Sequence, residues 1–301
     1  MVKISVVVNT RNEEKTIGKC LGSVRDFADE IVVADMESTD KTVEIAKKYK
    51  AKIFPHPFIN YVELARNFAL QNAGGEYILV IDPDEELPAV LAKKLKRVAE
   101  ENRIDYLEIP RKNIIFGQWI KHSRWWPDWN IRFFKRGKVE WGDKIHLPPT
   151  AEGEGERLEA SEENALIHYH YQTVSQYIER LNRYSDVQAE NLIAGGYNFT
   201  WEDLLQKPAD EFLSRFFAGR GYKDGLHGLV LAILQAFSEF VLYLKVWEKG
   251  GFSPRREILR EFNKEAEKVT KDLRFWQRKA IYDEAPLLKK AFLKFKNKIF
   301  K

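Results

Sequence analysis

Residues 3–81 alternate short apolar runs with helical patterns, and this alternation restricts the fold more than any other feature of the chain. The apolar runs are rich in β-branched residues, which is typical of strands buried on both faces in a parallel sheet. Parallel strands need crossover connections, and helical patterns separate each run from the next. The order therefore predicts an α/β fold with a Rossmann-like, mostly parallel sheet. The predicted strands are 3–8, 31–34, 52–54 and 77–81, and the predicted helices are 13–24, with Asn12 as N-cap, 38–48 and 64–71.

The strand predicted at 77–81 ends at a cluster of acids, Asp82, Asp84, Glu85 and Glu86. Carboxylates at the end of a central strand are costly to bury unless a cation lies beside them. Ligands of open α/β sheets bind at that end of the strands. A divalent cation that holds a diphosphate fits both conditions, because Mg²⁺ sites commonly combine one or two carboxylates with phosphates. A strand that ends in a solvated acidic turn is the alternative interpretation.

Polar residues also follow the first two predicted strands, in the segments 10–13 and 35–40. Acids and small hydroxyl side chains at three separate strand ends are much less expected by chance than at one. The chain has no GxGxxG after its first strand and no GxxxxGK[ST], so it lacks both the dinucleotide fingerprint and the P-loop. A nucleotide at this edge must be held mainly by side chains and a metal.

Charge and cysteine content restrict the surroundings of the protein. Cys20 is the single cysteine, which excludes an intramolecular disulfide and fits a reducing compartment. No secretory signal is visible, so we expect a cytoplasmic location. The net charge of +4 is uneven: residues 251–301 carry 15 Lys/Arg against 7 Asp/Glu, a net +8, which leaves −4 for the first 250 residues. The basic segment suggests an anionic partner such as a membrane surface or nucleic acid.

Short motifs recur in order over residues 1–247: NTRNE (9–13), DMESTD (35–40), ARN (65–67), DPD (82–84), PRKN (110–113), WPD (126–128), RFF (132–134), His146, HYH (168–170) and LNRYS (181–185). Together they resemble the family 2 inverting glycosyltransferases of GT-A fold. The full set is similar to the branch that contains bacterial lipopolysaccharide-core β-1,4-glucosyltransferases. The motifs are specific for the family and much less specific for donor or acceptor.

The resemblance implies which residues bind the donor, for which we expect a UDP-sugar. Those around the nucleotide-sugar would be Thr10, Arg11, Glu13, Asp35, Ser38, Arg66 and Asp82, with Arg66 toward the diphosphate or sugar. A Mg²⁺ or Mn²⁺ ion would be held by Asp84, the direct ligand, with Asp82 and His146, although His146 also fits a structural role. The transfer reaction needs a cation near the diphosphate, because the departing nucleoside diphosphate gains negative charge that a cation stabilises.

An inverting transfer needs a general base for the acceptor hydroxyl. The candidates are Asp128, Glu140, Asp143 and His146. Asp128 is favoured, because it lies in the Trp-Pro-Asp segment of a tryptophan-rich stretch, 116–141, that could exclude water and raise its pKa. The indoles of this stretch could pack on sugar rings or in the core of the sheet.

The C-terminal part is predicted to be helical, which divides the chain into a GT-A domain, 1–215, and an extension, 216–301. Thr173 and Gln176 form a capping box before a helix over 173–194. The apolar stretch 225–246 fits an in-plane membrane helix or a packing helix, and a single crossing stays open. Residues 286–301 contain six lysines and no acid, which favours a membrane-surface helix over one docked on the body.

The sequence therefore predicts a metal-dependent inverting glycosyltransferase for cell-envelope glycans. It would transfer one sugar to a lipid-linked acceptor at the inner face of the membrane and would not bind nucleic acid. The processive-synthase motif Gln-x-x-Arg-Trp is absent, since Lys121 stands where Gln is needed. A nucleotidyltransferase and a non-catalytic protein that binds nucleotide-sugars or membrane surfaces are the alternatives.

Overall fold

The computed structural model describes residues 2–59, 62–142, 149–287 and 289–290. The chain divides into two compact units, which are described separately. Unit 1 comprises residues up to 115 and 126–170, and unit 2 comprises 116–125 and the residues from 171 onward. The boundary expected at residue 215 stays a prediction.

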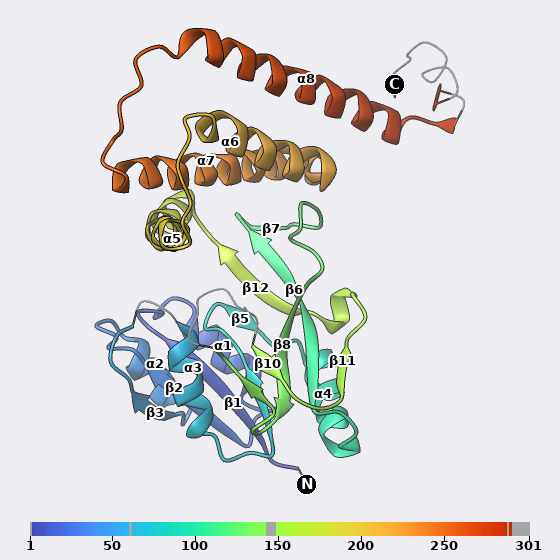
Figure 1. The fold of residues 1–301 in the computed structure, drawn as a ribbon. Helices are drawn as coiled ribbons and strands as arrows, with labels where there is room; N and C mark the ends of the chain where they lie inside the picture. Colours follow the sequence, from blue (N-terminus) through green and yellow to red (C-terminus); the bar gives the residue numbers. More distant parts are fainter. Residues whose placement is uncertain (1, 60–61, 143–148, 288, 291–301) are drawn as a thin grey trace. The chain divides into compact units, whose positions relative to one another are not determined.

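The first four strands of unit 1 are parallel and lie in the order β3-β2-β1-β4 (Figure 1). Each strand corresponds to one of the predicted apolar runs: β1 Ile4–Thr10, β2 Glu30–Asp35, β3 Lys52–Pro55 and β4 Tyr77–Val80. Every residue of β1, β2 and β4 is buried, as the composition of these runs predicts. The predicted α/β class is confirmed.

Three helices form the crossovers between these strands: α1 Ile17–Val24, α2 Thr42–Lys48 and α3 Val62–Gln71. With α4 Ala89–Glu101, which follows the acidic turn, they cover both faces of the sheet. The side chains of β1 alternate between the two faces. Val6 and Val8 pack with residues of α1 and α4, whereas Val7 packs with residues of α3. A strand that is apolar at every position is required because both of its faces are covered.

The second half of the sheet is mixed, and its order continues β4-β8-β6-β12-β5. Antiparallel pairs join β4 to β8, β8 to β6 and β12 to β5. These strands are β5 Glu85–Glu86, β6 Tyr106–Ile115, β8 Asp128–Lys135 and β12 Leu166–Tyr171. Strand β11 Gly155–Arg157 pairs with β6. Strands β9 Val139–Glu140 and β10 Thr150–Ala151 form a separate two-stranded ribbon, and η1 Glu162–Asn164 is a short helical turn.

The prediction that Asn12 caps the first helix is wrong. The N-cap of α1 is Thr16, and Asn12 lies before it in the left-handed region with φ of 54°. Its Oδ1 instead accepts a hydrogen bond from the Thr39 N–H at 2.8 Å. The second helix also begins later than predicted, at Thr42, because the Asp40 carboxylate accepts the Thr42 N–H at 2.9 Å.

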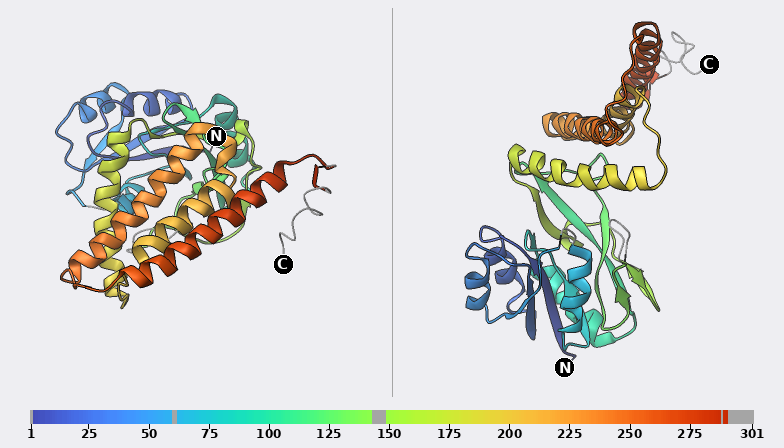
Figure 2. Two further views of the ribbon diagram at one scale, coloured as in Figure 1. Left: turned by 90° about the horizontal axis from the view of Figure 1, so that it is seen from above. Right: turned by 60° about the vertical axis from the view of Figure 1, so that its left-hand side comes forward.

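Unit 2 is helical, with α5 Val174–Ala194, α6 Asp203–Leu213, α7 Gly225–Lys249 and α8 Leu259–Glu284, the short turns η2 Ser214–Ala218 and η3 Gly221–Asp224, and the two-residue strand β7 Gln118–Trp119. The predicted cap of α5 is confirmed, since the Thr173 Oγ1 accepts the Gln176 N–H at 3.1 Å. Helix α6 lies alongside both α7 and α8 (Figure 2), and α5 packs on α7. In the predicted segment 286–301, residues 288 and 291–301 lie outside the described residues.

Candidate active site

The carboxyl ends of β1 and β2 bring Thr10 and Asp35 side by side, because these two residues are partners in the parallel register. The Asp35 Oδ2 accepts the Ser38 N–H at 3.1 Å. The Thr10 Oγ1, the Asp35 Oδ1 and both polar side-chain atoms of Asn9 are buried without a hydrogen-bond partner in the described part of the chain. Buried polar groups are normally paired, so these atoms are candidates for contacts to a bound molecule.

The loops that follow β1 and β2 hold each other through side-chain hydrogen bonds. The Ser38 Oγ accepts the Asn12 N–H at 2.9 Å. The Glu13 Oε2 accepts the Thr16 hydroxyl at 2.6 Å. The guanidinium of Arg11 lies 3.5 Å from the ring centroid of Phe58. The structure therefore places Thr10, Arg11, Glu13, Asp35 and Ser38 in or beside the ends of two adjacent strands.

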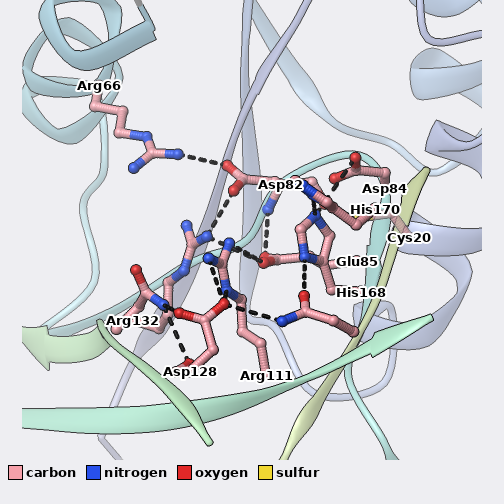
Figure 3. Close-up of polar contacts among 12 residues, drawn as sticks. Cys20, Arg66, Asp82, Asp84, Glu85, Arg111, Asp128, Arg132, His168 and His170 are labelled. Atoms are coloured by element: carbon pink, nitrogen blue, oxygen red, sulfur yellow. Dashed lines mark hydrogen bonds and ion pairs between the residues drawn. The ribbon is translucent and has the colours of Figure 1, made fainter. Parts of the chain in front are cut away.

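Asp82 follows β4 at the same edge of the sheet, and two arginines clamp it (Figure 3). The Arg66 Nη2 donates to the Asp82 Oδ1 at 2.7 Å, and the Arg132 Nη2 donates to the Oδ2 at 2.6 Å. Burial disfavours the carboxylate, but the charges of Arg132 and Arg66 outweigh this effect and hold the pKa of Asp82 well below its usual range. Asp82 is consequently ionised, and each of its oxygens accepts an arginine N–H.

Glu85 explains how an arginine is buried within strand β8. Its side chain is fully buried, and its Oε1 accepts the Arg132 Nη2 at 3.0 Å. The Glu85 Oε2 accepts the Asp82 N–H at 2.9 Å, and the Arg111 Nη1 lies 3.5 Å from Oε1. Glu85 thus joins Arg132 and the backbone of the acidic turn in one buried network.

Asp84, the expected metal ligand, lies beside His168. The antiparallel register of β5 and β12 pairs Glu85 with His168, which places the histidine next to the acidic turn. The His168 Nε2 is 3.6 Å from the Asp84 Oδ2 and 3.2 Å from the His170 Nδ1, and its Nδ1 is 2.6 Å from the Asn113 Oδ1 (Figure 3). Sequence reasoning left the roles of both histidines open.

The described residues contain no group of three or more His, Cys, Asp or Glu side chains that could hold a metal. His146, the further ligand expected from the sequence, lies outside the described residues. A Mg²⁺ ion bound by one or two carboxylates and by phosphates does not need such a group. Asp84 fits this use, whereas both Asp82 oxygens face arginines. Burial and the charge of Glu85 raise the pKa of Cys20, so this nearby residue stays a thiol and is unsuited as a ligand.

Asp128, the favoured base, lies directly opposite Arg111 in the antiparallel pair of β6 and β8. The Arg111 Nη2 and Nε are 2.7 and 2.9 Å from the Asp128 Oδ2. The side-chain amides of Asn113 and Asn130 donate to this carboxylate at 3.1 and 3.2 Å. The expected rise in its pKa is wrong: burial acts in that direction, but Arg111 and the two amides outweigh it and lower the pKa of Asp128.

The other residues considered as the base are less informative. Glu140 lies exposed in β9, and Asp143 and His146 fall outside the described residues.

Two tryptophans of the aromatic stretch pack within unit 1. Trp141 is buried beside Phe134, and the Trp129 Nε1 donates to the carbonyl of Leu158 at 3.0 Å.

Sequence reasoning placed the acidic pair correctly at the sheet edge but gave no role to several of its partners. These are Glu85, Arg111, Asn113 and Arg132. The signal for Arg132 was a charged residue inside an otherwise apolar run, which requires a buried partner of opposite charge. For Arg111, the signal was its position in a shared motif.

Comparisons with known proteins identify the family of the chain. The family model described as "Glycosyl transferase family 2" matches residues 5–151. An uncharacterised glycosyltransferase of Rickettsia typhi is 31% identical over 257 residues, which cover 82% of this chain and 88% of the relative. The lipopolysaccharide core biosynthesis glycosyltransferase LpsC of Rhizobium meliloti is 25% identical over 85% of this chain and 96% of its own. The crystal structure of S. aureus TarS 1–349 is 18% identical, covers 85% of this chain and 94% of its own, and gives a TM-score of 0.45.

Proposed function

The chain belongs to family 2 of the glycosyl transferases and has the GT-A fold, and from this premise we propose that it is a metal-dependent, inverting enzyme that transfers one sugar. The donor is a nucleotide-sugar, for which we expect a UDP-sugar, and the acceptor is a lipid-linked glycan of the cell envelope. The name of the LpsC relative, which refers to lipopolysaccharide core biosynthesis, supports an acceptor of this kind.

The observation that carries the proposal is the cluster of acids and arginines around Asp82 and Asp84. A donor diphosphate needs positive charge at its oxygens, and more of it as the leaving group departs. Arg66 and Arg132 bring two guanidinium groups to this edge of the sheet. Asp84 would hold the Mg²⁺ or Mn²⁺ ion, which supplies Lewis-acid stabilisation of the leaving diphosphate. His146 is a further proposed ligand, and Asp82 would be another once Arg66 leaves one of its oxygens.

The donor nucleoside would lie at the ends of β1 and β2. The unpartnered buried atoms of Thr10 and Asp35 support this assignment, because an incoming base or ribose would satisfy them. Arg11, Glu13 and Ser38 complete the proposed contacts. When the donor binds, Arg66 would release the Asp82 oxygen that it bonds and would itself contact the diphosphate or the sugar.

Asp128 is the proposed base. In a single displacement, the acceptor oxygen attacks the anomeric carbon, its proton passes to the Asp128 carboxylate, and the bond to the nucleoside diphosphate breaks on the opposite side. The lowered pKa of Asp128 keeps the carboxylate ionised at neutral pH, as a general base must be, and it also makes Asp128 a weaker base than an unpaired aspartate. Glu140, Asp143 and His146 are the alternatives if Asp128 serves Arg111 only.

The proposed location is the cytoplasmic side of the membrane, with peripheral attachment to an anionic surface and no nucleic-acid partner. The net charge of +8 over residues 251–301 supports this attachment. Attachment would bring the donor site of the enzyme to the membrane surface, where a lipid-borne acceptor lies.

The test is a turnover assay on the full-length protein with a set of nucleotide-sugars, in Mg²⁺, in Mn²⁺ and in EDTA. We expect a free nucleoside diphosphate as the product, metal dependence, and loss of both in Asp84→Asn. Glu86→Gln is the matched control, since Glu86 is an acid two positions after Asp84 whose ion pair is with Lys19 at 3.2 Å. Release of pyrophosphate would indicate a nucleotidyltransferase, and full activity in EDTA would contradict the metal assignment.

A further inference from the structure

Helix α7 has one side that is apolar from Leu226 to Leu244 and is not covered within the described residues. Residues that recur at intervals of three and four form this side, which we call the apolar stripe: Leu226, Val230, Ile233, Phe237, Val241 and Leu244. Leu226 is 72% exposed, Ile233 52% and Phe237 44%, and the other three are partly exposed. The stripe contains no polar residue, and its 18 steps of helix correspond to about 27 Å.

The polar side chains of α7 point to its neighbours in unit 2 and not to the stripe. The Ser238 Oγ is 2.7 Å from the Tyr177 hydroxyl of α5, and the Lys245 Nζ donates to the Asn182 carbonyl of α5 at 2.6 Å. The Gln235 Oε1 accepts the Arg215 Nη2 at 3.0 Å. These contacts show that one side of α7 faces α5 and η2. The apolar stripe lies on another side of the helix.

A membrane crossing by α7 conflicts with these contacts. Length and composition alone would allow a crossing over Gly221–Lys249. In a crossing helix, however, Gln235, Ser238 and Lys245 would lie at membrane depth together with the charged helices that bind them, and exposing such residues to lipid is costly. An amphipathic helix that lies in the membrane plane needs only one apolar side.

The charge of the chain favours a lipid surface over a second copy of the protein. Residues 251–301 carry a net +8, six of these charges being lysines of the segment 286–301. Two copies that met through this part of the chain would repel each other, whereas an anionic lipid surface would attract it. Apolar insertion and lysine attraction together give the two signals that reversible membrane attachment needs.

We propose that the apolar stripe of α7 inserts into an anionic lipid surface, with α7 lying in the membrane plane. The stripe would enter the boundary between headgroups and acyl chains, and α5 and α6 would stay on the aqueous side of α7. This inference rests on the proposed function only for its purpose, which is to bring the enzyme to a lipid-borne acceptor.

The experiment measures co-sedimentation of the full-length protein with vesicles of phosphatidylglycerol and phosphatidylcholine, and with phosphatidylcholine alone. We expect binding to the anionic vesicles at low salt and much weaker binding to the neutral ones. Ile233→Gln and Phe237→Gln should each weaken binding about tenfold, since each removes an exposed apolar side chain that would be buried in the lipid. Val90→Gln on α4 is the matched control, because Val90 is an exposed apolar residue of unit 1 at 56% exposure.

A second measurement reports insertion without relying on loss of binding. An environment-sensitive fluorophore attached in Ile233→Cys should become shielded from an aqueous quencher when anionic vesicles are added, whereas the same label in Val90→Cys should not. The native Cys20 is buried and should label poorly. Donor hydrolysis without vesicles should be unchanged in all variants, which separates this inference from the proposed function.

Several outcomes would overturn the inference. The first is a protein that stays in the supernatant with anionic vesicles, and the second is an affinity for these vesicles that is unchanged in both Ile233→Gln and Phe237→Gln. Self-association without lipid that Phe237→Gln abolishes would assign the stripe to a second copy. Resistance to extraction by alkaline carbonate would indicate a crossing helix instead.

Discussion

Replacing Arg132 by methionine tests the buried network that holds the acidic turn. The Arg132 side chain is 3% exposed and bonds both Asp82 and the fully buried Glu85. Removal of one partner of a buried ion pair typically costs about 3–5 kcal/mol, because it leaves a charge without compensation. Arg66 still neutralises Asp82, and Arg111 lies 3.5 Å from Glu85. We therefore expect Arg132→Met to lower the free energy of unfolding by about 3 kcal/mol at pH 7.

The pH dependence of this loss has a definite sign. Arg132 depresses the pKa of Asp82 in the folded state, so its contribution is fully present above the pKa of Asp82 in the unfolded chain. The contribution is lost as the pH falls toward the folded value. The difference between wild type and Arg132→Met should consequently shrink below about pH 4.

Urea denaturation followed by tryptophan fluorescence, at pH 7 and at pH 3.5, is the assay. Arg103→Met is the control, because the Arg103 pair with Glu101 is largely exposed and its removal should not change stability measurably. Adding Glu85→Met to Arg132→Met should recover part of the loss, since it removes the uncompensated charge. A loss below about 0.5 kcal/mol, or a loss that does not depend on pH, would refute the reasoning.

Three further predictions concern separate parts of unit 1. Asp84→Asn should lower transfer by on the order of 10² or more without changing the urea midpoint, because the metal-binding carboxylate is lost; retained transfer would exclude Asp84 as the ligand. Asp128→Asn should lower turnover by on the order of 10² while calorimetry shows near-normal donor binding; full turnover would assign the base elsewhere. Glu30→Gln should lower the free energy of unfolding at pH 7 by roughly 2–3 kcal/mol. Burial raises the pKa of Glu30, but Lys52, Ser5 and the Gly74 N–H outweigh it and lower this pKa from 4.5 to about 2. This contribution should be present above pH 4.5 and fade toward pH 2, and urea midpoints that stay equal to wild type would contradict it.

The parallel half of the sheet was predictable because its signal is local. Runs such as 77–81 are apolar at every position, and that composition is nearly restricted to strands covered on both faces. Strand β8 was not predicted as a strand. Its eight residues include Asp128, Asn130 and Arg132, so no apolar run marks it as a strand. Arg132 is buried through its bond to Glu85 of β5, and Asp128 is paired with Arg111 of β6.

The site was predictable only as far as strand ends determine it. Parallel strands bring their carboxyl ends to one edge, so Thr10, Asp35 and Asp82 could be grouped from the sequence. The partners of these acids depend on antiparallel registers between distant segments, which no local pattern specifies. The pairing of Arg111 with Asp128 is such a register, and it reverses the direction of the pKa shift that the aromatic surroundings of Asp128 suggested.

The charges of the cluster would couple the proposed metal site to donor binding. The carboxylates of Asp82, Glu85 and Asp128 pair with arginines, and Asp84 lies beside His168. With three guanidinium groups, those of Arg66, Arg111 and Arg132, and four carboxylates, these described side chains carry a net charge of −1. A divalent cation alone would reverse the sign of this charge in a largely buried cluster, and a doubly charged diphosphate alone would add to it. Bound together they nearly cancel each other, so each should favour the binding of the other, and the coupling must act equally in both directions. Arg66 and Arg132 both bond Asp82, and under this proposal they would hold the acidic turn in place before metal and diphosphate bind.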